Sequence, residues 1–148
     1  MANELVRGIS GFASLQMAAE GFLIDPLDPG SSFDDPATLA RRLVLGNTHA
    51  SKFALTLADD FVAQYQVLAQ YRNDPVLTSG TGFSGTLFRN RITDELTLSF
   101  RSTEFIDDAV RDSKATNELE VKEIGWALGQ IAEMERWYKD VLLGDSRL

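Results

Sequence analysis

The segment Phe100–Glu104 (FRSTE) combines residue types that could stabilise a negatively charged oxygen. It follows an alternating apolar run, so a strand is expected to end here and lead into a turn of small hydroxyl residues, Ser102 and Thr103. Such a turn can aim backbone N–H groups and a hydroxyl at one point, which is what an oxyanion hole requires. An ordinary exit from a strand has the same composition, so spacing alone leaves both interpretations open.

Ser84 lies in a glycine-flanked segment, GFSG, that partly matches the nucleophile motif of serine hydrolases. That motif requires Gly-x-Ser-x-Gly between a strand and a helix. Here Thr86 occupies the last position, and Ser84 opens a predicted strand. We therefore expect Ser84 to be a strand residue without a catalytic role.

His49 is the only histidine, so a catalytic triad or a histidine-based metal site would have to use it. It lies in a polar connector, GNTH, upstream of the predicted strands. A surface or capping role is favoured over catalysis.

Four carboxylates follow the FRSTE segment closely and could bind a hard cation or perform acid–base chemistry: Glu104, Asp107, Asp108 and Asp112. Their spacing does not match a calcium-binding loop. Arg111 and Lys114 can balance the charge, so a solvated loop is the favoured interpretation.

The elements around these residues can be placed from hydrophobic periodicity. Two strands, about 83–91 and about 95–101, are expected to form an antiparallel hairpin with its turn at Arg91–Asp94. A long helix, about 118–143, is expected after them, because Asn117 and Glu120 resemble a capping box and Gly144 can end the helix. Its apolar face comprises Ile124, Ala127, Leu128, Ile131, Met134, Tyr138, Val141 and Leu142, with Trp137 at the edge. Both aromatic residues are expected to pack in the core.

The first half of the chain favours helices. Residues 1–24 are mildly amphipathic, and residues 25–35 read as a loop because of their Asp-Pro and Pro-Gly pairs. The possible apolar face of the first helix comprises Leu5, Ile9, Phe12 and the segment Leu15–Ala19. A second helix is expected to be capped by Asp35, to begin at Pro36 and to end at Gly46-Asn47. A third is expected over about 51–71, with Leu57, Phe61, Tyr65, Leu68 and Ala69 at helical spacing.

Composition limits the classes of function. The chain has 148 residues, a net charge of −8, no cysteine and 44% hydrophobic residues, which fits one globular domain, 1–148. Its acidity disfavours nucleic-acid binding, and the lack of cysteine excludes disulfides and thiolate chemistry. The first residues do not form a secretory signal peptide, and no segment is apolar enough to predict a transmembrane helix.

The block from Thr81 to Tyr138 resembles the lipase-like region of bacterial RTX, hemolysin-type calcium-binding lipases. The residues that carry the resemblance are TGFSGTLFRNRITDELTLSFRSTEF and RDSKATNELEVKEIGWALGQIAEMERWY. The segment LSFRST, residues 98–103, is also similar to the F-R-G-[ST] strand and turn of class 3 lipases. The resemblance is looser over residues 46–74 and hardly constrains residues 1–45.

The resemblance implies an oxyanion hole at this turn. By position, Thr103 matches the hydroxyl residue that donates to the oxyanion, whereas Ser102 stands where class 3 lipases usually have glycine. In such lipases a strand, a G-[YH]-S-x-G elbow, the acidic residue and the histidine all come after the long helix. We therefore expect the nucleophile to lie outside these 148 residues and the chain alone to be inactive.

The fold class expected is α/β, the N-terminal part of an α/β-hydrolase fold with helices on a small sheet. The function implied is a segment of a secreted serine lipase or esterase acting on a lipid or ester, exported without an N-terminal signal; the chain's composition is equally compatible with a cytoplasmic location. No cofactor or metal is expected within this chain, although calcium-binding repeats are implied in the full-length protein. A missing C-terminal half, or self-association, is expected to cover the truncated sheet.

Two other functions stay open. The first is a non-catalytic helix-plus-hairpin interaction domain that binds a partner through exposed apolar helix faces. The second is a small carboxylate enzyme or calcium-binding domain based on Glu104, Asp107, Asp108 and Asp112.

Overall fold

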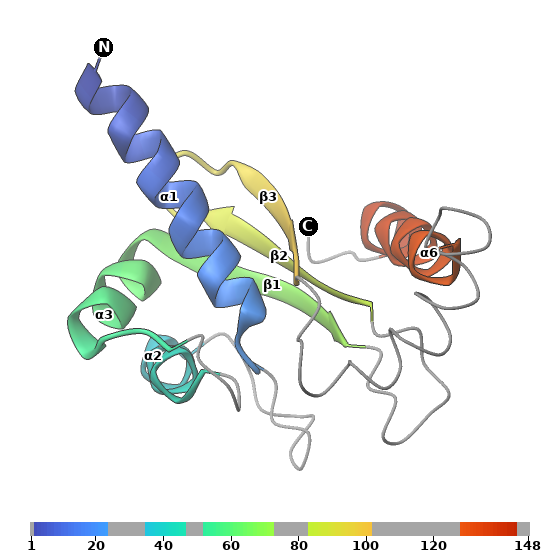
Figure 1. Cartoon of the computed structure of the whole chain (residues 1–148), viewed down its shortest axis with the longest axis horizontal. Coiled ribbons are helices and arrows are strands. Elements are labelled where there is room, and N and C mark those ends of the chain that lie inside the picture. The colour runs from blue at the N-terminus through green and yellow to red at the C-terminus, as the bar shows by residue number, and fades with distance from the viewer. Residues whose placement is uncertain (1, 24–34, 47–51, 73–82, 102–127, 145–148) are drawn as a thin grey trace. The chain divides into compact units, whose positions relative to one another are not determined.

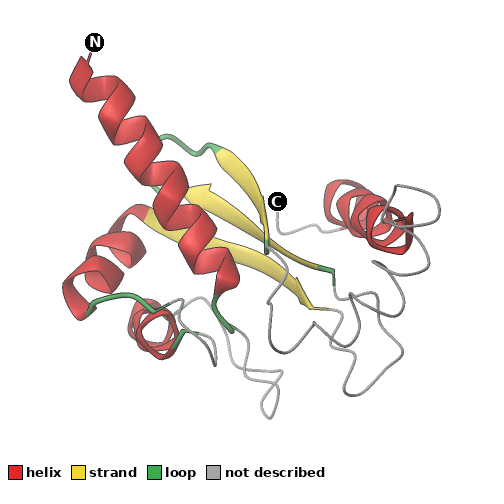
Figure 2. Ribbon diagram, in the orientation of Figure 1, coloured by secondary structure: helices red, strands yellow, loops and turns green. Residues whose placement is uncertain are grey.

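A computed structural model describes residues 2–23, 35–46, 52–72, 83–101 and 128–144. The elements in chain order are α1 (Ala2–Glu20), α2 (Pro36–Leu45), α3 (Leu55–Gln64), β1 (Tyr65–Arg72), β2 (Ser84–Asn90), β3 (Leu96–Phe100) and α6 (Leu128–Gly144) (Figure 1). The three strands form an antiparallel sheet in the order β1-β2-β3 (Figure 2). The described residues are therefore mixed α/β, as expected. An α/β-hydrolase fold and a single domain over 1–148 stay predictions.

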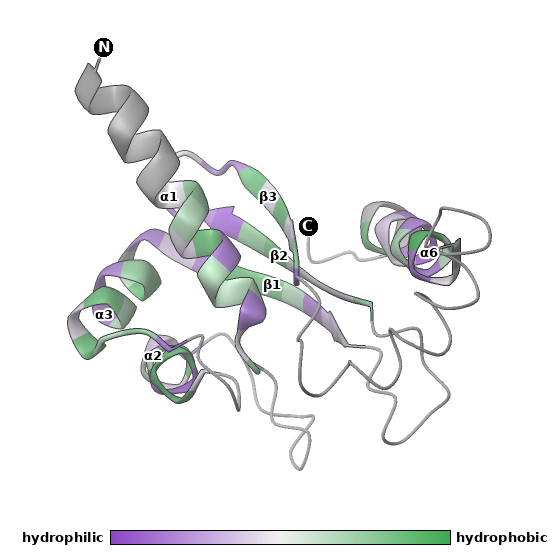
Figure 3. Ribbon diagram, in the orientation of Figure 1, coloured by the Kyte–Doolittle hydropathy of each residue, from purple (hydrophilic) through white to green (hydrophobic). Residues whose placement is uncertain are grey.

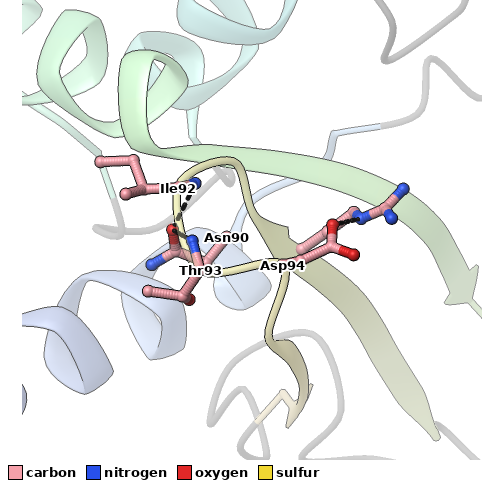
Figure 4. A network of polar contacts seen from close by, with 5 residues as sticks. Asn90, Ile92, Thr93 and Asp94 are labelled. Carbon is pink, nitrogen blue, oxygen red and sulfur yellow. Dashed lines mark hydrogen bonds and ion pairs between the residues drawn. The ribbon is translucent and has the colours of Figure 1, made fainter.

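The hairpin between β2 and β3 confirms both predicted strands and their turn. The Asn90 side-chain carbonyl accepts hydrogen bonds from the backbone N–H groups of Ile92 (2.8 Å) and Thr93 (3.1 Å), which folds the turn locally (Figure 4). Asp94 has a positive φ of 63°, a conformation that aspartate tolerates better than most residues. Its carboxylate also pairs with the Arg89 guanidinium, which holds the pKa of Asp94 below its ordinary value. Local turn chemistry thus sets the register of the hairpin.

Helix α2 begins and ends as its sequence predicts. The Asp35 carboxylate caps the helix by accepting hydrogen bonds from the Thr38 N–H (2.9 Å) and the Thr38 hydroxyl (2.6 Å). Both bonds lower the pKa of Asp35, the hydroxyl bond more than the backbone bond. Pro36 occupies the first turn, and Gly46 ends the helix with φ 63° and ψ −140°, a conformation that suits only glycine.

The helix expected over 51–71 is wrong in its second half, because α3 ends at Gln64 and β1 begins at Tyr65. Arg91, just after β2, explains the change. Its N–H donates to the Gln64 carbonyl (2.8 Å), and its Nε donates to the carbonyls of Val62 (3.1 Å) and Tyr65 (3.2 Å). These bonds satisfy carbonyls that the end of a helix leaves without a partner. Pairing with β2 therefore overrides the helical spacing of the apolar residues.

The fold has two compact units, the first comprising Met1–Gln70 with Thr86–Phe100. In this unit α1 contacts β3, and α2 packs against α3. The shared core comprises Leu15, Ala18, Ala19, Leu23, Leu39, Ala40, Leu43, Phe53, Ala58, Phe61, Tyr65, Val67 and Phe88. The second half of α1 accordingly carries apolar residues beside polar ones (Figure 3). Phe12 departs from its predicted place on the apolar face, since it is 64% exposed; the side chains of Leu5 and Ile9 lie outside the described part.

The second unit comprises Tyr71–Gly85 and Arg101–Leu148. Its described core is a triangle of aromatic rings, Tyr71, Phe83 and Trp137, with ring centroids 5.7 to 6.2 Å apart. Helix α6 matches the second part of the predicted long helix and ends at Gly144, the residue expected to stop it; the predicted segment before Leu128 lies outside the described residues. Trp137, expected at the edge of the apolar face, is 8% exposed and buried, whereas Tyr138 is 43% exposed. The buried face of α6 is therefore rotated from Tyr138, which was expected in the core, toward Trp137, because Trp137 packs against Tyr71 and Phe83.

Candidate functional site

The candidate site predicted from the sequence is the pair Ser102 and Thr103, which follows β3 in the chain. Ser102 and Thr103 themselves lie outside the described residues, as do His49 and the four carboxylates Glu104, Asp107, Asp108 and Asp112. The described residues nearest to the turn in sequence are Ser99, Phe100 and Arg101. Their hydrogen bonds show how the end of β3 is held.

The pairing of β3 with β2 extends beyond the strand itself. At one end Asn90 N–H donates to the Glu95 carbonyl (2.9 Å), and at the other Arg101 N–H donates to the Ser84 carbonyl (3.0 Å). In an antiparallel pair, alternate residues direct their backbone groups toward the partner strand. Glu95 and Arg101 are six positions apart, so both face β2, and Phe100 directs its carbonyl to the opposite, outer side of β3.

Gln16, on α1, binds this outward carbonyl. Its Nε2 donates hydrogen bonds to the Phe100 carbonyl (2.9 Å) and to Glu20 Oε1 (3.0 Å). Its Oε1 accepts a hydrogen bond from the Ser99 hydroxyl (2.8 Å). One side chain therefore holds two consecutive residues of β3 through both ends of its amide, and this places α1 on the strand that leads to the candidate turn.

Ser84 begins β2, as expected, and is 3% exposed. Within the described part of the chain, its Oγ has no hydrogen-bond partner. A serine nucleophile needs a base within hydrogen-bond reach, and this arrangement offers Ser84 none among those residues. The strand role predicted for Ser84 is confirmed.

Gln70 forms a second polar network in the same unit, buried in the sheet. Its Nε2 donates to the Gly21 carbonyl (3.1 Å) and the Thr86 hydroxyl (3.1 Å), and its Oε1 accepts from Leu23 N–H (3.1 Å). The side chain is 8% exposed. A neutral amide whose donors and acceptor are all hydrogen-bonded has no catalytic chemistry to offer. The role of this network is structural, because it holds the segment after α1 against β1 and β2.

In the second unit, a tyrosine and a carboxylate are in contact beside the aromatic triangle. The Tyr71 hydroxyl donates to Glu133 Oε1 (3.3 Å). Burial raises the pKa of Tyr71 above its ordinary value of 10.0, and the Glu133 charge raises it further. Tyr71 is therefore a neutral hydrogen-bond donor at physiological pH, which suits a structural role.

The described residues contain no group of three histidine, cysteine, aspartate or glutamate side chains placed to hold a metal ion. They also contain no helix that is both long and apolar enough to cross a membrane.

Sequence reasoning missed Gln16, Gln70, Thr86 and Ser99 as positioning residues. The sequence does contain a signal for Gln70, because an amide inside the run YQVLAQYR needs buried hydrogen-bond partners if that run is a strand. Gln16 had a weaker signal, a single polar residue between Leu15 and Met17-Ala18-Ala19. The signal for Gln70 depends on reading this run as a strand, and it is lost when residues 65–71 are predicted to be helical.

Comparison with known proteins adds no family to this geometry: no family model, no curated protein and no solved structure matches the chain.

Proposed function

We propose that this chain is the N-terminal, oxyanion-hole-bearing segment of a secreted serine lipase or esterase. Thr103 would donate its hydroxyl and backbone N–H to the developing oxyanion, and the Ser102 N–H would add a second donor. The serine, the acid and the histidine would come from residues outside 1–148. Preorganised donors of this kind stabilise the tetrahedral intermediate of ester hydrolysis.

The observation that supports the proposal best is the anchoring of the residues that directly precede Ser102. Residues 99–101 are held by the Gln16 amide and by the Ser84 carbonyl, immediately before Ser102. An oxyanion hole acts only if its donors need not reorganise during the reaction, and the anchoring of residues 99–101 supports the proposal in that respect.

The proposed donors can be tested directly on the chain with an anionic probe. Butylphosphonate, a stable oxyanion mimic, is titrated into the ¹⁵N-labelled chain, and the backbone amide shifts are followed by NMR. The expected result is a saturable shift at Ser102 and Thr103 that is lost in Thr103→Val. Shifts spread over Arg and Lys residues, unchanged in Thr103→Val, would mean non-specific ion pairing and would contradict the proposal.

The absence of a nucleophile can be tested by turnover. Losing the nucleophile and the base of a triad typically removes about 10⁶-fold in rate. We therefore expect the chain alone to hydrolyse p-nitrophenyl butyrate no faster than buffer. Hydrolysis that Ser84→Ala abolishes would overturn this view and make Ser84 the nucleophile. Reading the DNA downstream of the Leu148 codon is the complementary test, with a G-x-S-x-G motif after a short apolar strand expected.

A non-catalytic interaction domain is the second candidate, favoured by exposed apolar side chains in the first unit. Phe12 on α1 is 64% exposed, and Leu96 and Phe100 on β3 are 48% and 39% exposed. Single exposed apolar residues are common, but aromatic ones are enriched where partners bind. Sedimentation equilibrium of the chain and of Phe12→Ser separates the cases, because an interaction surface at Phe12 predicts self-association that the substitution weakens.

A further inference from the structure

The outer edge of β3 carries backbone groups that pair with no other described strand. β3 is the last strand in the order β1-β2-β3, so only one of its edges faces β2 (Figure 2). The two ladder bonds to β2 that flank β3, at Glu95 and at Arg101, have the same register, so no bulge lies between them. By alternation, Leu98 directs its N–H and its carbonyl away from β2. An edge of this kind can pair with a further strand.

The sequence of β3 lacks the side chains that usually prevent such pairing. The strand Leu96–Phe100 (LTLSF) contains no proline and no charged residue. Its apolar side chains occupy alternate positions, and those of Leu96 and Phe100 are 48% and 39% exposed. They lie on the face opposite Ser99, whose hydroxyl donates a hydrogen bond to Gln16 on α1. Helix α1 therefore packs on the other face of the strand.

The residues of β3 are complementary to a second copy of the same strand. In an antiparallel pair centred on Leu98, this residue lies opposite the partner's Leu98, and the two exchange both of their N–H···O=C bonds. Glu95 then lies opposite the partner's Arg101, and Leu96 lies opposite the partner's Phe100. We propose that the chain forms a two-fold dimer by this pairing, which joins two three-stranded sheets into one. This inference goes beyond the proposed hydrolase function and does not depend on it.

Charge favours this register over other pairings. Glu95 and Arg101 directly flank β3, and by alternation both fall on the face that carries Ser99. Opposite charges directly across a strand pair stabilise it, and like charges destabilise it. The two-fold axis makes the contact between Glu95 and the partner's Arg101 twice, whereas a parallel pair in register would oppose like charges at both positions. Because each copy uses the same surface, the interface closes at two copies.

Gln16 limits how far the intermolecular ladder can extend. The Phe100 carbonyl already accepts a hydrogen bond from Gln16 Nε2 (2.9 Å), so the intermolecular bonds are concentrated at Leu98. A short ladder flanked by ion pairs predicts a weak and reversible dimer, because exposed ion pairs contribute little individually.

Disulfide trapping tests the centre of the proposed pair. The chain has no cysteine, so Leu98→Cys introduces a single thiol, which the two-fold axis places opposite its own copy. Directly opposite Cα atoms are about 5.5 Å apart in a hydrogen-bonded pair, a distance that a disulfide can span. Ile92→Cys is the control, since Ile92 is 81% exposed at the hairpin turn and reacts in random collisions. In air, Leu98→Cys should form the linked dimer about tenfold faster than the control. Equal or slower linking would overturn the pairing.

Charge exchange tests the register by sedimentation equilibrium. The wild-type chain should show a concentration-dependent equilibrium between monomer and dimer. Glu95→Arg should weaken the dimer by about two- to thirtyfold, because it replaces two attractive contacts with two repulsive ones. Adding Arg101→Glu to this variant should restore the wild-type affinity. Asp59→Arg is the control, because it makes the same change of net charge at an exposed position on α3 and should not weaken the dimer.

Three results would contradict the proposal. The first is a wild-type chain that stays monomeric at every concentration. The second is a dimer that Glu95→Arg leaves unchanged or that the double exchange fails to restore; the trapping experiment decides the question if an exchanged variant does not fold. The third is a dimer that Phe12→Ser abolishes and the charge exchange does not affect, which would place the interface on α1 instead of β3.

Discussion

The side-chain amide of Gln70 donates a 3.1 Å hydrogen bond to the Thr86 hydroxyl, which joins β1 to β2 in the buried part of the sheet. The same amide binds the Gly21 carbonyl and the Leu23 N–H. This one side chain therefore connects residues 21–23, the segment after α1, to the sheet through polar groups that have little access to water.

Replacing Gln70 with leucine should destabilise the protein by about 2–4 kcal/mol, because buried donors and acceptors would lose their partners. The measurement is urea unfolding followed by far-ultraviolet circular dichroism. Gln66→Leu, on the same strand but half-buried, is the control and should change the free energy of unfolding by less than about 1 kcal/mol. Equal effects of the two substitutions would show that the network contributes nothing.

Removing the two hydroxyls on β2 should change the free energy of unfolding differently. Thr86→Val removes the hydrogen bond that Gln70 Nε2 donates to the Thr86 hydroxyl and should cost about 1–2 kcal/mol. Ser84→Ala removes a buried hydroxyl that has no partner among the described residues, so the free energy of unfolding should be unchanged within about 0.5 kcal/mol or should rise. A loss above about 1 kcal/mol for Ser84→Ala would reveal a hydrogen bond that Ser84 makes in solution.

Neighbouring aromatic residues on α6 should differ strongly in their contribution to stability. Trp137 is 8% exposed and packs on Tyr71 and Phe83, so Trp137→Ala should destabilise by about 3–5 kcal/mol. Tyr138 is 43% exposed, and Tyr138→Ala should cost less than about 1 kcal/mol. Thermal unfolding of both variants tests the rotated face of α6. If Tyr138→Ala destabilised the protein more than Trp137→Ala, the apolar face predicted from the sequence would be correct and the rotated face would be wrong.

The cap of α2 should make part of the stability depend on pH. The folded pKa of Asp35 is below its ordinary value of 3.8, so its stabilisation is fully present above that value. It is lost as the pH falls through the lower folded pKa, when the carboxyl becomes protonated. Asparagine caps a helix without titrating, so Asp35→Asn should lose less stability than wild type on acidification. Melting temperatures at neutral pH and below the pKa measure this, with Asp59→Asn on α3 as control.

Local chemistry made several elements predictable from the sequence. The Asp35-Pro36 start, the Gly46 stop and the turn at Arg91–Asp94 each depend on residues within a few positions of one another. The strand at Leu96–Phe100 was predictable because its apolar residues alternate. Features that depend on near neighbours are visible in a single sequence.

The start of β1 was not predictable in this way. Tyr65 continues the helical spacing of Leu57 and Phe61, and the groups that end α3 come from Arg91, far along the chain. Gln16 was not predicted for the same reason, since its partners on β3 lie more than 80 positions away. The proposed oxyanion residues, Ser102 and Thr103, lie outside the described residues, so their role stays a prediction from the resemblance.

The outward carbonyl of Phe100 has a consequence for association between molecules. Edge strands aggregate when a strand from another molecule finds a row of unused backbone donors and acceptors. Gln16 already uses the acceptor at Phe100, so an intermolecular ladder on β3 would have to break at that rung or displace the glutamine. Substitutions at Gln16 are therefore expected to promote fibril formation, which thioflavin fluorescence would detect.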